Sequence, residues 1–351
     1  MLTKLRTYLE VMRTSHAAGH IPVWRRAVEM AVLRVTRGLG PGYYLMGEFG
    51  DPHMRLEDKL QFYDGKAYRK RVYELNSPRY AKLSQHKMVE ASILRFFALP
   101  TPEAYGYFHP ERGRTTTGDP LRTPRDLAPL LESQRISKFV LKPSEGMEGR
   151  DFVAAERTSD GRIRRIDAED SESVEAFVEA QLVRPGGYLM QAYVIQHPEL
   201  AEVNPSSLNT VRMMTFQPKG EEPRCLGGFL RMGRAGSLVD NTSRGGLFSV
   251  VDLETGTLGP ARWPVPSSQL LENHPDSHAR IAGRTLPFWS ETRALCRAAL
   301  QAFPHIRFAG LDIGFSAEGP LVIELNVEPG YRGFALIQQP TARALSDRGR
   351  E

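Results

Sequence analysis

The sequence contains few cysteines and no long apolar run, and both features limit the classes of protein to which it can belong. Its two cysteines, Cys225 and Cys296, lie far apart in a chain of 351 residues. They support neither a disulfide framework nor a zinc site, and so low a count fits a reducing cytosol. No stretch approaches the roughly 18 apolar residues of a transmembrane helix, and charges scattered through the N-terminal segment argue against a signal peptide. We therefore expect a cytoplasmic protein without a transmembrane segment.

Several patterns of active and binding sites are also missing. The phosphate-binding pattern G-x-x-x-x-G-K-S/T does not occur. No Ser/His/Asp or Cys/His arrangement indicates a side-chain nucleophile. No basic stripe is interleaved with aromatic residues, which argues against nucleic-acid binding. The net charge of +5, from 46 basic and 41 acidic residues, is a small excess, although it suits an anionic ligand.

The first 37 residues indicate two helices separated by Pro22. Apolar residues recur at helical spacing in both parts: Leu2, Leu5, Leu9 and Met12, then Val28, Ala31, Val32 and Val35. Basic residues fill the other faces: Arg25, Arg26, Arg34 and Arg37. Helices of this kind bind membrane surfaces or partner proteins, but Glu10 and Glu29 interrupt the charge. We therefore favour an ordinary solvated helix face here.

The segment 310–330, GLDIGFSAEGPLVIELNVEPG, predicts a β-hairpin. Residues two apart share one face of a strand, so Glu324 and Asn326 lie on the same side, and strand pairing would bring Asp312 beside Glu324. Two carboxylates and an amide oxygen suit Mg²⁺, which takes further ligands from water and substrate phosphates. An exposed hairpin edge would carry the same residues without a metal, and this segment alone does not decide between the two interpretations.

A second informative stretch begins with a strand that ends at Lys142. The strand leads into a loop containing Ser144, Gly146 and Gly149. Glycines let phosphate oxygens approach the backbone closely, and a lysine adds a positive point charge. An ordinary turn has the same composition. Arg212, in the apolar run L-N-T-V-R-M-M-T-F, likewise fits an exposed strand face or an ion pair.

Taken in order, these features resemble the ATP-grasp superfamily. The order is Lys87 before a helix, Lys142 before its loop, N-T-V-R, an N-x-x-R-G-G loop, and D-I-…-V-I-E-L-N-…-P-G. The runs VIQHPELAEVNPSSLNTVRMMTF and GGLFSVVDLETG look like the sugar-transfer-associated ATP-grasp family. That family is related to ribosomal-protein glutamate ligases and to carboxylate–amine ligases of the glutathione-synthetase type. The resemblance covers roughly residues 85 to 340.

The resemblance implies an α+β fold in which two subdomains grip ATP between them. We expect a helical region at 1–84, an N-terminal subdomain with the phosphate loop at 85–195, and a C-terminal subdomain with the Mg²⁺ and ATP site at 196–340. A frayed tail would occupy 341–351.

The resemblance also assigns roles to the nucleotide-binding residues. Lys87 and Lys142 would contact the phosphates or the adenine, and the loop containing Ser144, Gly146 and Gly149 would close over the β- and γ-phosphates. The adenine edge would be read by the interdomain hinge of Gln191, Tyr193 and Val194. A Glu commonly follows the Gln in that hinge, but Ala192 stands there in this chain. Glu199, with Glu202 as its rival, would contact the ribose.

The remaining roles concern the metal and the reaction. Asp312, Glu324 and Asn326 would bind one or two Mg²⁺ ions. Arg212 would hold the γ-phosphate or an acyl-phosphate, and Asn241 and Arg244 would line the substrate side. The resemblance leaves the role of Glu328 open.

The implied activity is an Mg²⁺- and ATP-dependent ligase. It would activate a small-molecule carboxylate as an acyl-phosphate and join it to an amine or another nucleophile, with cell-surface sugar or peptide modification as one setting for this reaction. The same residues would also serve a small-molecule or sugar kinase. A third interpretation is a non-catalytic nucleotide-binding module that docks a partner through its N-terminal helices. The sequence specifies neither the acceptor nor the oligomeric state.

Overall fold

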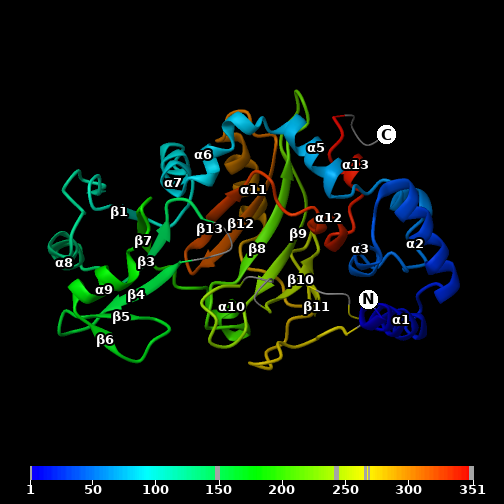
Figure 1. Cartoon of the computed structure of the whole chain (residues 1–351), viewed down its shortest axis with the longest axis horizontal. Coiled ribbons are helices and arrows are strands. Elements are labelled where there is room, and N and C mark those ends of the chain that lie inside the picture. The colour runs from blue at the N-terminus through cyan, green and yellow to red at the C-terminus, as the bar shows by residue number, and fades with distance from the viewer. Residues whose placement is uncertain (1, 147–150, 241–244, 265–266, 268, 348–351) are drawn as a thin grey trace.

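The computed structural model describes residues 2–146, 151–240, 245–264, 267 and 269–347. Two antiparallel sheets lie side by side along the long axis of the molecule, and the N-terminal helices lie at the end away from the smaller sheet (Figure 1). Helices and strands mixed in this way confirm the expected α+β class. Within the described part of the chain, no helix has both the length and the apolar character required to cross a membrane.

The N-terminal region contains the two predicted helices and three shorter ones: α1 (Leu2–Ala17), α2 (Val23–Arg37), α3 (Pro41–Met46), α4 (Leu56–Lys59) and α5 (Gly65–Leu75). Pro22 immediately precedes α2, where a missing N–H is tolerated. Gly38 ends that helix in the left-handed region, at φ 71°. A Cβ at Gly38 would lie 2.7 Å from Asp64 Oδ2, so both its conformation and its surroundings favour glycine.

The smaller sheet has the strand order β2-β1-β7-β3-β4-β5-β6. Its strands are β1 (Ala104–Phe108), β2 (Arg114–Thr115), β3 (Lys138–Pro143), β4 (Val153–Arg157), β5 (Ile163–Arg165), β6 (Ser171–Glu172) and β7 (Tyr188–Ala192). Phe139, Leu141 and Met190 face the core that this sheet shares with α8 (Pro124–Ser133) and α9 (Val174–Gln181). Because side chains alternate along a strand, Lys142 and Gln191 belong to the opposite face.

Three short helical segments connect the N-terminal region to the smaller sheet: the 3₁₀ helix η1 (Pro78–Tyr80), α6 (Lys82–Gln85) and α7 (Lys87–Phe96). The larger sheet has the order β11-β10-β9-β8-β12-β13. Its strands are β8 (Thr210–Phe216), β9 (Arg224–Met232), β10 (Leu247–Val251), β11 (Leu258–Arg262), β12 (Phe308–Ser316) and β13 (Gly319–Asn326). The short helix α10 (Pro198–Val203) precedes this sheet in sequence.

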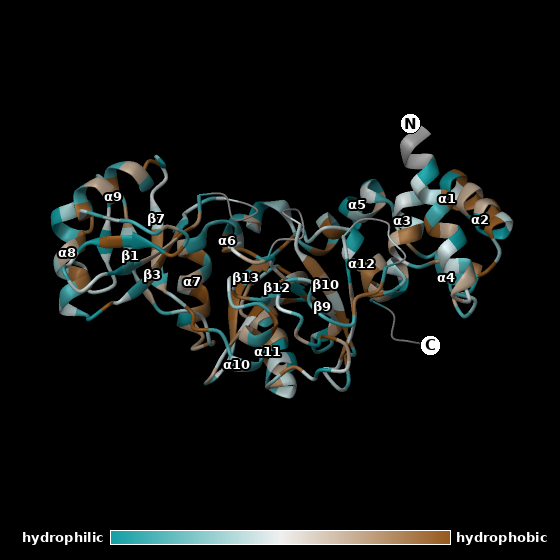
Figure 2. Ribbon diagram, turned by 90° about the horizontal axis from the view of Figure 1, so that it is seen from below, coloured by the Kyte–Doolittle hydropathy of each residue, from teal (hydrophilic) through white to brown (hydrophobic). Residues whose placement is uncertain are grey.

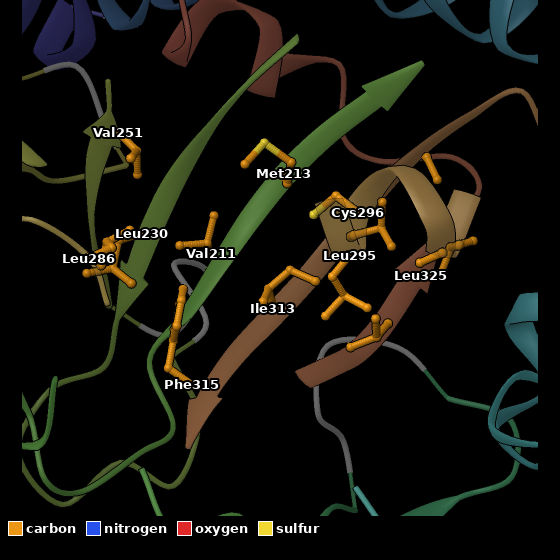
Figure 3. Close-up of a cluster of buried hydrophobic side chains, with 14 of the residues drawn as sticks. Val211, Met213, Leu230, Val251, Leu286, Leu295, Cys296, Ile313, Phe315 and Leu325 are labelled. Atoms are coloured by element: carbon orange, nitrogen blue, oxygen red, sulfur yellow. The ribbon is translucent and has the colours of Figure 1, made fainter. Parts of the chain in front are cut away.

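One face of the larger sheet packs against α11 (Trp289–Gln301). Val211 and Met213 of β8 and Ile313 of β12 meet Leu295 and Cys296 of the helix in one apolar core (Figure 3). The hairpin of β12 and β13 forms as predicted, with Asp312 opposite Glu324.

The N-terminal helices pack on the other face of the same sheet. Met214, Phe216, Phe229 and Phe308 of the strands share a core with Leu33, Tyr43, Tyr44, Tyr68 and Val72 of the helices. α12 (Arg332–Leu336) joins this core, and so does α13 (Thr341–Ala344) with Leu345. The expectation of a frayed tail at 341–351 is therefore wrong for its first residues. Apolar side chains hold them in place, and the Arg71 side chain donates from Nη2 to the Leu345 carbonyl at 2.6 Å.

Asn76, directly after α5, joins the N-terminal helices to the larger sheet. Its buried side chain donates to the carbonyls of Phe308 and Val327, at 2.6 and 2.7 Å, and accepts from the N–H groups of Arg307 and Phe308, at 2.9 and 3.0 Å. One amide thus satisfies four backbone groups, which fixes how α5 enters the sheet.

We expect Asn76→Ala to lower the free energy of unfolding by roughly 3–5 kcal/mol, because it leaves several buried backbone groups without a partner. Urea unfolding followed by circular dichroism measures the change. Asn273→Ala is the matched control, since Asn273 is exposed. A loss at position 76 of about 1 kcal/mol or less, the size of an average substitution, would contradict the bridging role.

Candidate active site

Three charged residues lie at one level across three neighbouring strands of the larger sheet. Asp312 of β12 is paired with Arg212 of β8 on one side and with Glu324 of β13 on the other. Alternation along the strands places them on the face opposite α11, beyond the part that the N-terminal helices cover. We call Arg212, Asp312 and Glu324 the charged row.

Asp312 is buried between two guanidinium groups. Arg212 donates to both of its oxygens, with Nη2 2.9 Å from Oδ2, and Arg231 Nη2 also lies 2.9 Å from Oδ2. Burial opposes the charge of Asp312, but the two guanidinium groups outweigh burial and hold the pKa of this carboxyl below its usual value. Asp312 is therefore an anion fixed in place by two cations.

Arg231, on β9, is a site residue that the sequence patterns did not reveal. Its Nη2 lies 2.6 Å from Thr210 Oγ1, and its Nε lies 3.4 Å from Asp240 Oδ2. Burial raises the pKa of Asp240, although Arg231 and a 2.5 Å hydrogen bond from Thr210 favour its charged form. A single arginine thus serves two buried carboxyl groups.

Lys87, at the start of α7, lies over the far end of the charged row. Its Nζ is 2.5 Å from Glu324 Oε1 and 3.4 Å from Glu90 Oε2. Its backbone N–H donates to the Ser144 carbonyl at 2.8 Å, which ties the start of α7 to the loop after β3. The structure thus brings Lys87 to the expected metal residues and holds it next to the expected phosphate loop.

The other members of this cluster are Lys142 and Glu90. Burial, and then the nearby Lys87, lower the pKa of Lys142, although Glu90, Glu324 and Asp312 partly offset both effects. Burial raises the pKa of Glu90 to about 7, while its Oε1 accepts from the Leu325 N–H at 2.5 Å. Burial also opposes the charge of Lys87, but Glu90 and Glu324 raise its pKa overall. Two lysines and three carboxylates are therefore electrostatically coupled around the end of the row.

The expected phosphate loop is described only in part. Ser144 Oγ donates to the Gly186 carbonyl at 2.5 Å, so the hydroxyl already has a protein partner. A Cβ at Gly146 would lie 3.6 Å from Pro143 Cβ, an ordinary contact, so space alone does not require glycine there. Gly149, Asn241 and Arg244 lie outside the described residues, and their predicted roles stay predictions.

The hinge residues lie where the chain leaves the smaller sheet. Gln191, on β7, is buried on the same sheet face as Lys142; its Nε2 donates to the Pro102 carbonyl at 3.3 Å, and its Oε1 has no hydrogen-bond partner. Tyr193 and Val194 follow the end of the strand, and the Tyr193 ring lies under Lys138 Nζ, 5.8 Å from the ring centroid.

The two ribose candidates lie at α10. Glu199 is exposed, and Arg284 donates to its backbone carbonyl at 2.9 Å. Glu202 pairs with the same arginine at 3.2 Å. The ion pair favours Glu199 as the freer carboxylate, and its ribose contact stays a prediction.

The chemistry of the metal candidates fits Mg²⁺. Asp312 and Glu324 are directly opposed, and Asn326 pairs with Gly310 on the same two strands. No three His, Cys, Asp or Glu side chains in the described ranges cluster as a metal cage. Mg²⁺ usually takes one or two carboxylates and completes its shell with water and substrate phosphates. Asp312, Glu324 and Asn326 would hold such an ion.

Glu328 has a structural contact that the resemblance did not supply. Arg69 Nε lies 2.8 Å from its Oε1, and the Tyr73 hydroxyl lies 3.3 Å from its Oε2. Glu328 therefore joins the segment after β13 to α5 and takes no part in the charged row.

The description of the matching family model places this chain in the ATP-grasp class. The model is that of the sugar-transfer associated ATP-grasp family, it matches residues 67–348, and the protein therefore belongs to this family. No curated protein matches the chain significantly.

Solved structures similar to the chain include three synthetases and ligases. N5-carboxyaminoimidazole ribonucleotide synthetase from Thermotoga maritima has 13% identity over 81% of this chain and 55% of its own, at a TM-score of 0.42. The D-alanine-D-alanine ligase from Coxiella burnetii has 9% identity over 71% of this chain and 49% of its own, at a TM-score of 0.40. The L-amino acid ligase from Bacillus licheniformis has 13% identity over 72% of this chain and 43% of its own, at a TM-score of 0.39. The chain thus spans about half the length of these proteins.

We expect Arg231→Met to lower the free energy of unfolding by roughly 3–5 kcal/mol near pH 8, because two buried carboxylates lose a shared cation. Arginine partners hold the folded-state pKa of Asp312 low, so this contribution is present at neutral pH and is lost on acidification. The effect of the substitution should therefore persist at pH 5 and shrink only as the pH falls toward about 3, below the ordinary carboxyl pKa of 3.8.

Urea titrations near pH 8 and near pH 3 test this expectation. Arg234→Met is the control, since Arg234 pairs with Asp276 at the surface and its loss should change stability by about 0–1 kcal/mol. Equal effects of the two substitutions would show that Arg231 has no special role.

Proposed function

We propose that the protein is an Mg²⁺- and ATP-dependent ligase that activates a carboxylate as an acyl-phosphate and joins it to an amine. The observation that carries this proposal is the charged row, with Lys87 and Lys142 gathered at its open end. Carboxylates next to several cations, with Glu324 still one-third exposed, suit a metal-bound polyphosphate. Family membership supports ATP as the ligand.

The residues of the smaller sheet would bind the nucleotide. The buried Gln191 Oε1 lacks a donor, and an unsatisfied buried acceptor is costly, so a ligand amino group such as that of adenine would complete it. The ring of Tyr193 and the backbone of Val194 follow directly along the chain. Lys142, on the same sheet face, would contact the phosphates, and Glu199 the ribose.

The larger sheet would bind the reacting groups. Mg²⁺, when bound through Asp312, Glu324 and Asn326, would neutralise charge on the transferred phosphoryl group. Lys87 would exchange the Glu324 carboxylate for a phosphate oxygen, so it keeps an anionic partner throughout. Arg212 is already oriented by Asp312 and would stabilise the γ-phosphate or the acyl-phosphate. The loop with Ser144, Gly146 and Gly149 would exclude water, and Asn241 and Arg244 would orient the acceptor.

The reaction needs no nucleophilic side chain of the protein. The substrate carboxylate attacks the γ-phosphorus, and an amine then displaces phosphate from the acyl-phosphate. The sugar-transfer description of the family favours an acceptor used in cell-surface sugar or peptide modification.

We expect Glu324→Gln to reduce ATP-dependent phosphate release by at least about 100-fold, because it removes a metal-binding charge and the anionic partner of Lys87. Glu328→Gln is the matched control: it makes the same chemical change four residues away, outside the row, and should keep near-normal activity. A screen of amino acids, peptides and amino sugars with ATP and Mg²⁺ provides the assay.

The mass of the product then distinguishes the reaction classes. A ligase joins two substrates and frees phosphate, whereas a kinase leaves phosphate on its acceptor. Wild-type turnover in the Glu324 variant would refute the assigned site, and tight ATP binding without turnover on any acceptor would refute the enzymatic function.

A further inference from the structure

Helix α2 buries two charged residues and exposes several apolar ones. Arg26 and Glu29 are buried, whereas Trp24, Val28 and Val35 are 70%, 55% and 85% exposed. An ordinary surface helix turns its apolar residues toward the core; in α2 Leu33 does so, whereas these three side chains face outward. From the sequence we favoured an ordinary solvated helix face here, whereas the outward face of α2 carries these apolar side chains.

The exposed apolar side chains form one continuous stripe. At about 100° per residue, the outward residues span an arc of roughly 140°. They are the exposed Trp24, Ala27, Val28, Ala31 and Val35 together with the half-buried Val32, and we call them the α2 stripe. Arg25 and Arg34 border it on either side. In Figure 2, α2 lies at the end of the molecule away from α8 and α9 and carries hydrophobic residues.

The buried charges fix the orientation of this helix. Arg26 Nη1 donates to the Met12 carbonyl at 3.0 Å and to Ser15 Oγ at 2.6 Å. Glu29 Oε2 accepts from the Tyr44 hydroxyl at 2.6 Å and lies 2.7 Å from Lys59 Nζ. Turning the stripe inward would strand these charges, and an unpaired buried charge is strongly destabilising. The stripe is therefore held toward the outside.

The net charge of the chain is concentrated in the same region. Seven basic and two acidic residues fall within the first 37 positions, so this segment carries the whole excess of +5 and the remainder of the chain is formally neutral. Of the two acids, Glu29 is buried with Lys59, and Glu10 pairs with Arg6. On α2 itself, Arg25, Arg34 and Arg37 are exposed, so the helix that carries the stripe also presents positive charge.

We propose that the α2 stripe and its arginines bind an anionic lipid surface. An apolar helix face bordered by basic side chains lies in a membrane interface, with the apolar side chains at the acyl boundary and the arginines among the headgroups. Trp24 suits such an interface, where tryptophan is enriched. The charge of the segment selects a negatively charged surface. This inference is independent of the proposed ligase activity, because α2 precedes the family match at 67–348.

The test is flotation of the full-length protein with vesicles of phosphatidylcholine, with and without about one-third phosphatidylglycerol, at low and physiological salt. We expect binding to the anionic vesicles that weakens with salt. A blue shift of Trp24 fluorescence, absent from a Trp24→Phe variant, should accompany it. Trp24→Ser with Val35→Ser should weaken binding on the order of tenfold or more.

Phe96→Ser with Val183→Ser is the matched control, because these side chains are 82% and 70% exposed elsewhere on the molecule. Arg34→Gln with Arg37→Gln should remove the preference for anionic over neutral vesicles. Thermal unfolding verifies that each variant is folded.

Three outcomes would overturn the proposal. The first is a wild-type protein that does not float with the anionic vesicles. The second is equal flotation of the Trp24→Ser/Val35→Ser and Phe96→Ser/Val183→Ser variants. The third is self-association of the wild type that is lost in the Trp24 and Val35 variant, which would identify the stripe as a contact between copies of this chain.

Discussion

The face of the larger sheet opposite α11 has two different tasks, and the rest of the structure depends on how they are divided. One part of this face is apolar and packs under the N-terminal helices, α12 and α13. The neighbouring part carries Arg212, Asp312 and Glu324. The N-terminal helices do not cover this part, and Lys87 contacts it through Glu324. The same strands therefore build a core and a polar site, separated only by position along the strand.

The polar part is stable without a ligand because its charges compensate one another. Asp312 has two guanidinium partners, Arg231 has two carboxyl partners, and Glu324 is matched by Lys87. Buried charges are tolerated when each is paired and hydrogen-bonded. The arrangement also keeps the side chains oriented before any substrate arrives, which is the condition for effective electrostatic stabilisation.

Local patterns predicted part of this structure, and long-range contacts limited the rest. The Asp312–Glu324 pairing followed from one hairpin, and the helices on either side of Pro22 followed from periodicity. Lys87 lies 237 residues from Glu324, and only the family resemblance brought the two together. The sequence did not predict Arg231 and Glu90 as site residues, because a single charged residue in an apolar segment ordinarily faces solvent. A signal for Glu90 was its position three residues after Lys87, on the same side of α7. Periodicity found the apolar residues of α2 but not their direction, because Arg26 and Glu29 depend on partners in other helices.

The bridge made by Asn76 bears on how the chain folds during synthesis. The N-terminal helices leave the ribosome before the strands of the larger sheet, yet Asn76 bonds to Phe308, 232 residues later in the chain. Until those strands are made, Tyr68 and Val72 lack the sheet that buries them in the finished protein. Domains generally fold from the N-terminus as they emerge, and exposed apolar surface invites aggregation. The N-terminal helices of this protein therefore reach their native packing only after β12, β13, α12 and α13 have been made.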